Sequence, residues 1–179
     1  MDIYKQRFTI LQQEILSYLS IYAGESFSGR KLARALKVSP TAISNSIKNL
    51  KTLNLINVKK DFLLFITLNL ETEKTIQIKR LINLDLFYRS GILSHLKEKL
   101  LGSTIILFGS YAFGEDIYGE SDVDIAIIGR KESILNLKIF EKKLKRKINL
   151  NFYQDVREIP ENLRYNILNG FILHGRLWG

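Results

Sequence analysis

Apolar residues recur at helical spacing through the first part of the chain. They fall every three or four positions until Gly24 interrupts the pattern, and this period predicts an amphipathic helix. The residues of its apolar face are Ile3, Phe8, Leu11, Ile15, Leu16, Leu19 and Ile21. We therefore expect a small domain that opens with a helix.

Two further helices are predicted directly after it. Ser28 is a suitable N-cap for a helix over 29–36, and Ser39 followed by Pro40 joins a cap to the residue preferred at the first helical position. The turn between these two helices is short, as a helix-turn-helix requires.

The last of these helices has two different faces. Ile43, Ile47 and Leu50 share one stripe and are expected in the core. The polar residues that point the other way are Thr41, Ser44, Asn45 and Lys48.

A hairpin is predicted over 55–58 and 62–68, with a polar turn made of Lys59, Lys60 and Asp61. Together with the helices, this order resembles a winged helix-turn-helix over residues 5–69. The resemblance implies a domain over 1–70 that binds duplex DNA. Its polar stripe, Thr41, Ser44, Asn45 and Lys48, would face the major groove, and Lys59 and Lys60 would meet phosphate or the minor groove. A winged helix that serves only protein contacts stays open.

The pattern changes in the second half. Residues 71–83 predict a linker helix and 84–100 a further amphipathic helix. Apolar runs at 104–108, 123–128 and 148–152 predict strands, with a helix over 133–144 between the last two. The alternation predicts a small α/β domain over 84–179 with a mixed sheet, so the whole chain is expected to be α+β.

Charge and composition narrow the function. Of the net charge of +9, residues 1–70 carry 10 Lys and Arg against 4 Asp and Glu, which favours an anionic partner such as nucleic acid. A basic surface that serves solubility alone stays open.

With no cysteine there is no disulfide, thiol nucleophile or Cys-based zinc site. No apolar run approaches the roughly 18 residues of a membrane span, and no secretory signal opens the chain, so a soluble cytoplasmic protein is expected.

One stretch carries most of the chemistry. A buried strand ends in Gly109-Ser110, and Asp122 and Asp124 follow on a second strand. The spacing of two residues places both carboxylates on one face. Gly109 permits close backbone approach, and Ser110 adds a hydroxyl suited to phosphate oxygens. Hard carboxylate oxygens favour Mg²⁺ or Mn²⁺, which in turn bind a nucleoside triphosphate.

This arrangement resembles the nucleotidyltransferase superfamily of DNA polymerase beta, and within it the minimal nucleotidyltransferases. The pattern is Gly-Ser, a spacer that is eleven residues long here, and Asp-x-Asp in an apolar strand. The resemblance implies nucleotide binding by Gly109 and Ser110 and catalysis with metal binding by Asp122 and Asp124. It further implies transfer of a nucleoside monophosphate to an acceptor hydroxyl. Antitoxins of this kind modify a partner toxin, commonly of the HEPN type, so a protein acceptor is expected.

The superfamily also has a third carboxylate, on a neighbouring strand. Asn149 stands at the corresponding place here, and its amide oxygen can bind a metal but carries no charge. Glu141 and Asp155 are alternative sources of that carboxylate. Two functions therefore stay open, a metal-dependent transferase and a non-catalytic regulator or antitoxin that senses nucleotide. Whether the chain forms a homodimer also stays open.

Overall fold

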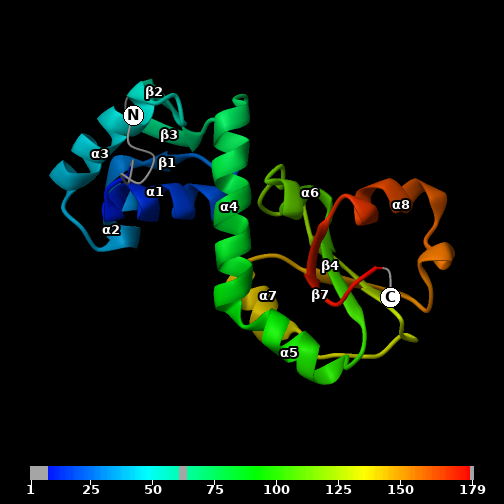
Figure 1. The fold of residues 1–179 in the computed structure, drawn as a ribbon. Helices are drawn as coiled ribbons and strands as arrows, with labels where there is room; N and C mark the ends of the chain where they lie inside the picture. Colours follow the sequence, from blue (N-terminus) through cyan, green and yellow to red (C-terminus); the bar gives the residue numbers. More distant parts are fainter. Residues whose placement is uncertain (1–7, 61–63, 178–179) are drawn as a thin grey trace. The chain divides into compact units, whose positions relative to one another are not determined.

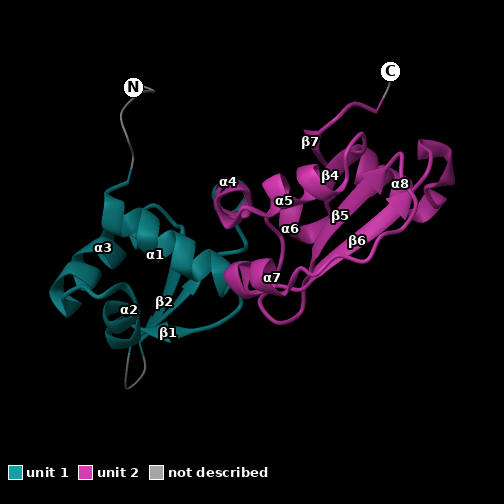
Figure 2. Cartoon of the chain, turned by 90° about the horizontal axis from the view of Figure 1, so that it is seen from below, with its two compact units in different colours: residues 1–79 teal, residues 80–179 magenta. Residues whose placement is uncertain are grey.

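The structure, a computed structural model, describes residues 8–60 and 64–177. The chain divides into two compact units, residues 1–79 and 80–179 (Figure 2). The division falls inside a single helix, α4 (Glu73–Ser90), so both units contribute residues to it. Within the described residues, no helix combines the length and apolar character that crossing a membrane requires.

The first unit combines three helices with a small antiparallel sheet (Figure 1). Its elements are α1 (Ile10–Ile21), β1 (Phe27–Ser28), α2 (Gly29–Leu36), α3 (Pro40–Thr52), β2 (Ile56–Lys60) and β3 (Leu64–Leu68). The strands lie in the order β1-β3-β2, and β3 is antiparallel to both neighbours. This confirms the winged helix-turn-helix fold that the sequence predicted.

Short polar side chains start each helix of this unit. Thr9 and Gln12 form a capping box in which each side chain accepts the backbone N–H of the other. Ser28 and Ser39 each accept, at 3.2 Å, the backbone N–H three residues further on. Both predicted serine caps are therefore confirmed, and a cap of this kind stabilises a helix by about 1 kcal/mol.

The second unit is built around a four-stranded mixed sheet. Besides its part of α4, its elements are α5 (Ile92–Lys99), β4 (Thr104–Phe108), α6 (Gly109–Phe113), β5 (Val123–Ile128), α7 (Lys138–Leu144), β6 (Ile148–Tyr153), the 3₁₀ helix η1 (Val156–Glu158), α8 (Glu161–Leu168) and β7 (Phe171–His174). The strand order is β6-β5-β4-β7, with β5 and β6 parallel and the other pairs antiparallel. The predicted α+β class and mixed sheet are confirmed.

The two faces of this sheet are covered differently. Val123, Ile125 and Ile127 of β5 pack in the core that contains α5 and α7. Ala126 and Ile128 point to the other face, where they pack with η1, α8 and the segment that joins them. Because strand residues alternate, Asp122 and Asp124 share the face of Ala126. They lie at the end of β5 opposite to Ile128.

The predicted helix boundary at residues 83 and 84 is wrong. Instead of a linker helix over 71–83 and another over 84–100, one helix runs through Glu73–Ser90. Gly91 then adopts φ +86°, a left-handed conformation that glycine tolerates, and α5 begins after it. No proline or glycine lies within 73–90 to end a helix earlier.

The predicted helix over 133–144 is too long, since α7 begins only at Lys138. Asn136 accepts the backbone N–H of Lys138 through its side chain. This local bond offers the backbone an alternative to a helical turn, as asparagine commonly does.

The hairpin also differs in detail from its prediction. Lys59 and Lys60 are the last residues of β2, paired with Phe65 and Leu64, and do not lie in a turn. Cross-strand pairing continues to the end of β2, and exposed lysines suit an edge strand. Strands β1 and β7 were not predicted. The predicted positions at Ile3, Asp61 and Phe62 lie outside the described residues.

Candidate functional site

Two carboxylates lie side by side where β5 begins. Asp122 immediately precedes the strand, and Asp124 is its second residue. Asp122 Oδ2 and Asp124 Oδ1 each lie 3.1 Å from one atom, the amide nitrogen Nδ2 of Asn149. Because one nitrogen reaches both, the two carboxylates are close enough to share a cation. The structure thus brings together the three residues that the sequence singled out as metal ligands.

The absence of a side chain at Gly109 leaves space for the carboxylate of Asp124. A Cβ atom at position 109 would lie 2.7 Å from Asp124 Oδ2, closer than real contacts allow. Gly109 also adopts φ +77°, which other residues avoid. Strand β4 ends one residue earlier, at Phe108, which pairs with Asp124. Ser110, partly exposed, follows in α6. Gly109 therefore lies beside Asp124, and Ser110 is the next residue along the chain.

Asn149 occupies the neighbouring strand at the level of Asp124. The two residues are Cα partners in the parallel pair β5 and β6. The Asn149 side chain presents its NH₂ group to both carboxylates, so it acts as a hydrogen-bond donor there. A metal ligand at this position would have to present the amide oxygen instead. The amide, a neutral donor, therefore bridges the two carboxylates by hydrogen bonds.

The residues present fit a divalent cation, with one charge fewer than three carboxylates would supply. Asp122 and Asp124 offer hard oxygen ligands, and rotation of the Asn149 side chain would add a third oxygen. Within the described residues, no group of three or more His, Cys, Asp or Glu side chains gathers around one point. The donor set suits Mg²⁺ or Mn²⁺ held jointly with an oxygen-rich ligand such as a triphosphate.

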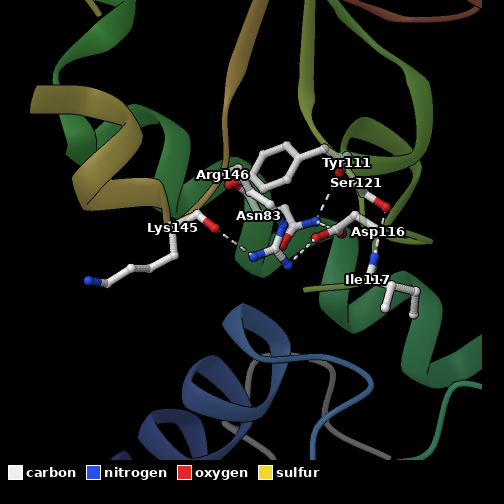
Figure 3. Close-up of polar contacts among 7 residues, drawn as sticks. All are labelled: Asn83, Tyr111, Asp116, Ile117, Ser121, Lys145 and Arg146. Atoms are coloured by element: carbon white, nitrogen blue, oxygen red, sulfur yellow. Dashed lines mark hydrogen bonds and ion pairs between the residues drawn. The ribbon is translucent and has the colours of Figure 1, made fainter. Parts of the chain in front are cut away.

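A buried ion pair supports the loop that leads to Asp122. Arg146 Nη2 donates to Asp116 Oδ2 at 2.8 Å, and the two side chains are 2% and 0% exposed (Figure 3). Arg146 Nη1 also donates to the backbone oxygen of Lys145. Since Asp116 precedes Asp122 by six residues and Arg146 precedes Asn149 by three, the pair ties together the segments that lead into β5 and β6.

Helix α4 joins the same network. Asn83 Nδ2 donates to Asp116 Oδ1 at 2.7 Å and to the backbone oxygen of Tyr111 at 2.9 Å. The Tyr111 hydroxyl donates back to the backbone oxygen of Asn83 (Figure 3). Burial, and next the nearby Asp116 carboxylate, raise the pKa of Tyr111 far above its ordinary value, so its hydroxyl stays protonated. These residues were not predicted, because no local sequence pattern marks contacts between positions 28 to 33 residues apart.

The alternative carboxylates lie in different surroundings. Glu141 lines an open cavity of about 530 Å³ together with Asp122, and its Oε1 accepts the backbone N–H of Ile148. Asp155 is bound by Arg157 at 2.7 Å, and this contact lowers the pKa of Asp155 to about 2. Glu141 is thus the alternative that lies close to Asp122.

The first unit exposes the predicted polar stripe of α3. Ile43, Ile47 and Leu50 are buried on the inner side of the helix, as predicted. The residues exposed on its outer side are Thr41, Ser44, Asn45 and Lys48, and Lys59 and Lys60 are exposed on β2. This polar, basic surface has the composition that a contact with DNA needs.

Comparison with known proteins agrees with the division of the chain into two units. Residues 89–174 match the family model of a nucleotidyltransferase domain. Residues 11–61 match that of an HTH domain. The chain joins an HTH domain to a nucleotidyltransferase domain. No curated protein matches the sequence at a significant level.

Solved structures of two bacterial proteins resemble part of the chain. The adhesin competence repressor AdcR from Streptococcus pyogenes is 24% identical, with 53% of this chain and 69% of that chain covered and a TM-score of 0.42. ZitR from Lactococcus lactis, solved in complex with DNA, is 21% identical, with 55% and 66% covered and a TM-score of 0.41.

Proposed function

We propose that the nucleotidyltransferase domain binds a nucleoside triphosphate with Mg²⁺ or Mn²⁺ and transfers the nucleoside monophosphate to an acceptor hydroxyl. The observation that carries the proposal is the pair Asp122 and Asp124, held together beside the glycine turn at Gly109. Two carboxylates in such proximity repel each other unless a cation or donor lies between them. The match of residues 89–174 to a nucleotidyltransferase domain supports the same function.

The proposed reaction is a displacement at the α-phosphorus of the nucleoside triphosphate. A bond forms between the acceptor oxygen and the α-phosphorus, the bond from that phosphorus to the β-phosphate bridge breaks, and pyrophosphate leaves. The hydroxyl proton must pass to a base. The divalent ion, when bound, would hold phosphate oxygens and offset their charge. Asp122 and Asp124 would position it, and Gly109 keeps the space beside Asp124 open.

Asn149 limits the rate in this proposal. Its amide cannot accept the hydroxyl proton, and the loss of a general base typically costs about 10²- to 10⁴-fold in rate. We therefore expect nucleotide binding to be readily measured and transfer to be slow. The proposed acceptor is a hydroxyl group of a protein. The resemblance to antitoxins among the minimal nucleotidyltransferases suggests a partner toxin of the HEPN type.

Transfer of label from ATP tests the proposal. Full-length protein, Mg²⁺ and a cell lysate are incubated with ATP labelled at the α-phosphate, and labelled macromolecules are separated on a gel. Asp124→Asn should abolish labelling, while Asp85→Asn, an exposed control on α4, should leave it unchanged. ATP labelled at the γ-phosphate should give no labelled species that depends on the added protein, because this label leaves with pyrophosphate. Label that appears equally with both ATP forms, or equally with Asp124→Asn, contradicts the proposal.

A second function is favoured by the Asn149 amide. Because it already donates to both carboxylates, the site can hold together without a metal and without turnover. The chain would then be a regulator that senses nucleotide, with the HTH domain binding DNA. Absence of labelling combined with a change in DNA affinity on adding ATP would favour this function over transfer.

A further inference from the structure

The HTH domain contains a pocket that its fold does not fill. The pocket has a volume of about 570 Å³ and opens between α2, α3 and the hairpin of β2 and β3. Its apolar lining consists of Ile43, Ile47, Val58, Leu64 and Ile66. Leu64 is 48% exposed, so part of this lining faces water. Pockets of this size and character commonly hold small organic ligands.

Basic side chains surround the apolar lining. They are Arg30, Lys48, Lys51 and Lys60, all exposed. In the described part of the chain, no acidic residue lines the pocket. The basic side chains alone would suffice to bind the phosphate backbone of DNA. Contact with phosphate would not stabilise the apolar lining of the pocket. A lining of this kind instead gains from covering by apolar surface.

The pocket also has open space at its α2 side. Gly29 is part of the lining, and a Cβ atom placed there would meet no other atom within 4 Å. Its φ is not in the left-handed region, so a larger residue fits the backbone as well. A bulky side chain at position 29 would therefore meet no neighbouring atom at its Cβ, and because Gly29 lines the pocket we expect such a side chain to reduce the space there.

We propose that this pocket binds an amphipathic organic anion, a small molecule with an apolar body and one carboxylate or sulfonate group. The apolar body would cover Leu64 and its neighbours, and the anionic group would meet the surrounding cations. This site is separate from the proposed transferase site, which lies in the other unit of the chain.

Ligand and DNA would compete for this part of the protein. Ser44 and Lys48 of α3 and Lys60 of β2 line the pocket and also belong to the surface assigned to DNA. A bound anion would offset one unit of this positive charge and cover the side of α3. Occupation of the pocket should therefore lower the affinity for DNA, and DNA should lower the affinity for the anion.

The first test uses 1-anilinonaphthalene-8-sulfonate, a fluorescent aromatic anion, with the full-length protein. We expect saturable binding that Gly29→Phe weakens at least tenfold, because the new side chain fills the pocket. Ala35→Phe is the matched control, since Ala35 is exposed on the same helix and does not line the pocket. Equal affinity in the wild type and Gly29→Phe would overturn the proposal.

The second test separates charge from apolar contact. N-phenyl-1-naphthylamine has the same ring system without the sulfonate. Lys51→Gln should weaken binding of the anionic probe about threefold to fivefold, as expected for one exposed charge pair, and leave the neutral probe unaffected. Lys51 is not among the residues assigned to DNA. Equal loss for both probes, or no loss for either, would contradict an anion site.

The third test measures competition by fluorescence anisotropy of a labelled DNA duplex of mixed sequence at low salt. Saturating anionic probe should release the duplex from the wild type and not from Gly29→Phe. Release from both proteins, or from neither, would show that binding in the pocket does not affect binding of DNA. It would overturn the proposed competition between the anion and DNA. Transfer of label from ATP is a separate measurement, so its failure would leave this proposal standing.

Discussion

Asn149 is the residue on which the chemistry of the site depends most. Its Nδ2 lies 3.1 Å from an oxygen of each aspartate, so it provides two hydrogen bonds where a third carboxylate would provide charge. A neutral amide compensates the repulsion between Asp122 and Asp124 without a metal. It also has to turn before its oxygen can bind one.

Asn149→Asp should therefore tighten Mg²⁺ binding and raise the transfer rate. The new carboxylate would add charge to the site and supply a group able to accept the proton. Titration with Mn²⁺ followed by electron paramagnetic resonance measures the first effect, and label transfer from ATP measures the second. Asn151→Asp, two residues further along β6, is the matched control and should produce neither change. If Asn149→Asp changes neither the transfer rate nor the metal affinity, Asn149 is not part of the site.

Gly109→Ala should damage the same site by a steric route. The added Cβ would lie 2.7 Å from Asp124 Oδ2, and alanine at φ +77° is strained by about 1 kcal/mol. We expect weaker binding of ATP with Mg²⁺ in calorimetry while the fold is retained. Gly119→Ala, which also has a positive φ but meets no atom within 4 Å, controls for the backbone strain alone. Equal losses in both variants would show that contact with Asp124 is unimportant.

At the scale of elements, the buried pair of Asp116 and Arg146 joins the segments that lead into β5 and β6. Asp116→Ala should cost about 3–5 kcal/mol, because it leaves the Arg146 charge buried without its partner. Hydrogen exchange of the full-length chain should show faster exchange in β5 and β6. Asp85→Ala removes an exposed partner of Arg89 and should change exchange little. Unchanged protection in Asp116→Ala would show that the pair does not hold these strands.

The elements also show what could be predicted from sequence. Helix starts at Ser28 and Ser39 and the buried strands at 104–108 and 123–128 have local signals, and all were found. The proximity of Asp124 and Asn149 was expected from the resemblance to the nucleotidyltransferase superfamily, whose third carboxylate lies on a neighbouring strand, and β5 and β6 pair the two residues. The continuity of α4 has a local signal, the absence of proline and glycine within 73–90, whereas the contacts of Asn83 with Tyr111 and Asp116 depend on residues distant in sequence. No local pattern encodes them.

At the scale of the whole molecule, the chain joins a basic HTH domain to a nucleotidyltransferase domain. Binding of the full-length protein to duplex DNA should weaken steeply as salt rises, because phosphate contacts release counterions. Lys48→Gln should reduce the slope of log affinity against log salt by about 1, as expected for one lost phosphate contact. Lys97→Gln, exposed on α5, should leave the slope unchanged. Binding that does not respond to salt would indicate a domain that contacts protein.

Calorimetric titration of the full-length protein with ATP, with and without Mg²⁺, tests the proposed nucleotide site directly. We propose that Asp122 and Asp124 hold the metal and nucleotide together. We expect saturable binding that requires Mg²⁺ in the wild type and in the surface control Asp85→Asn. The double variant Asp122→Asn and Asp124→Asn keeps side-chain size and should lose at least tenfold in affinity. Binding of ATP with Mg²⁺ that is equally tight in the double variant, or no binding in the wild type, would contradict the claim.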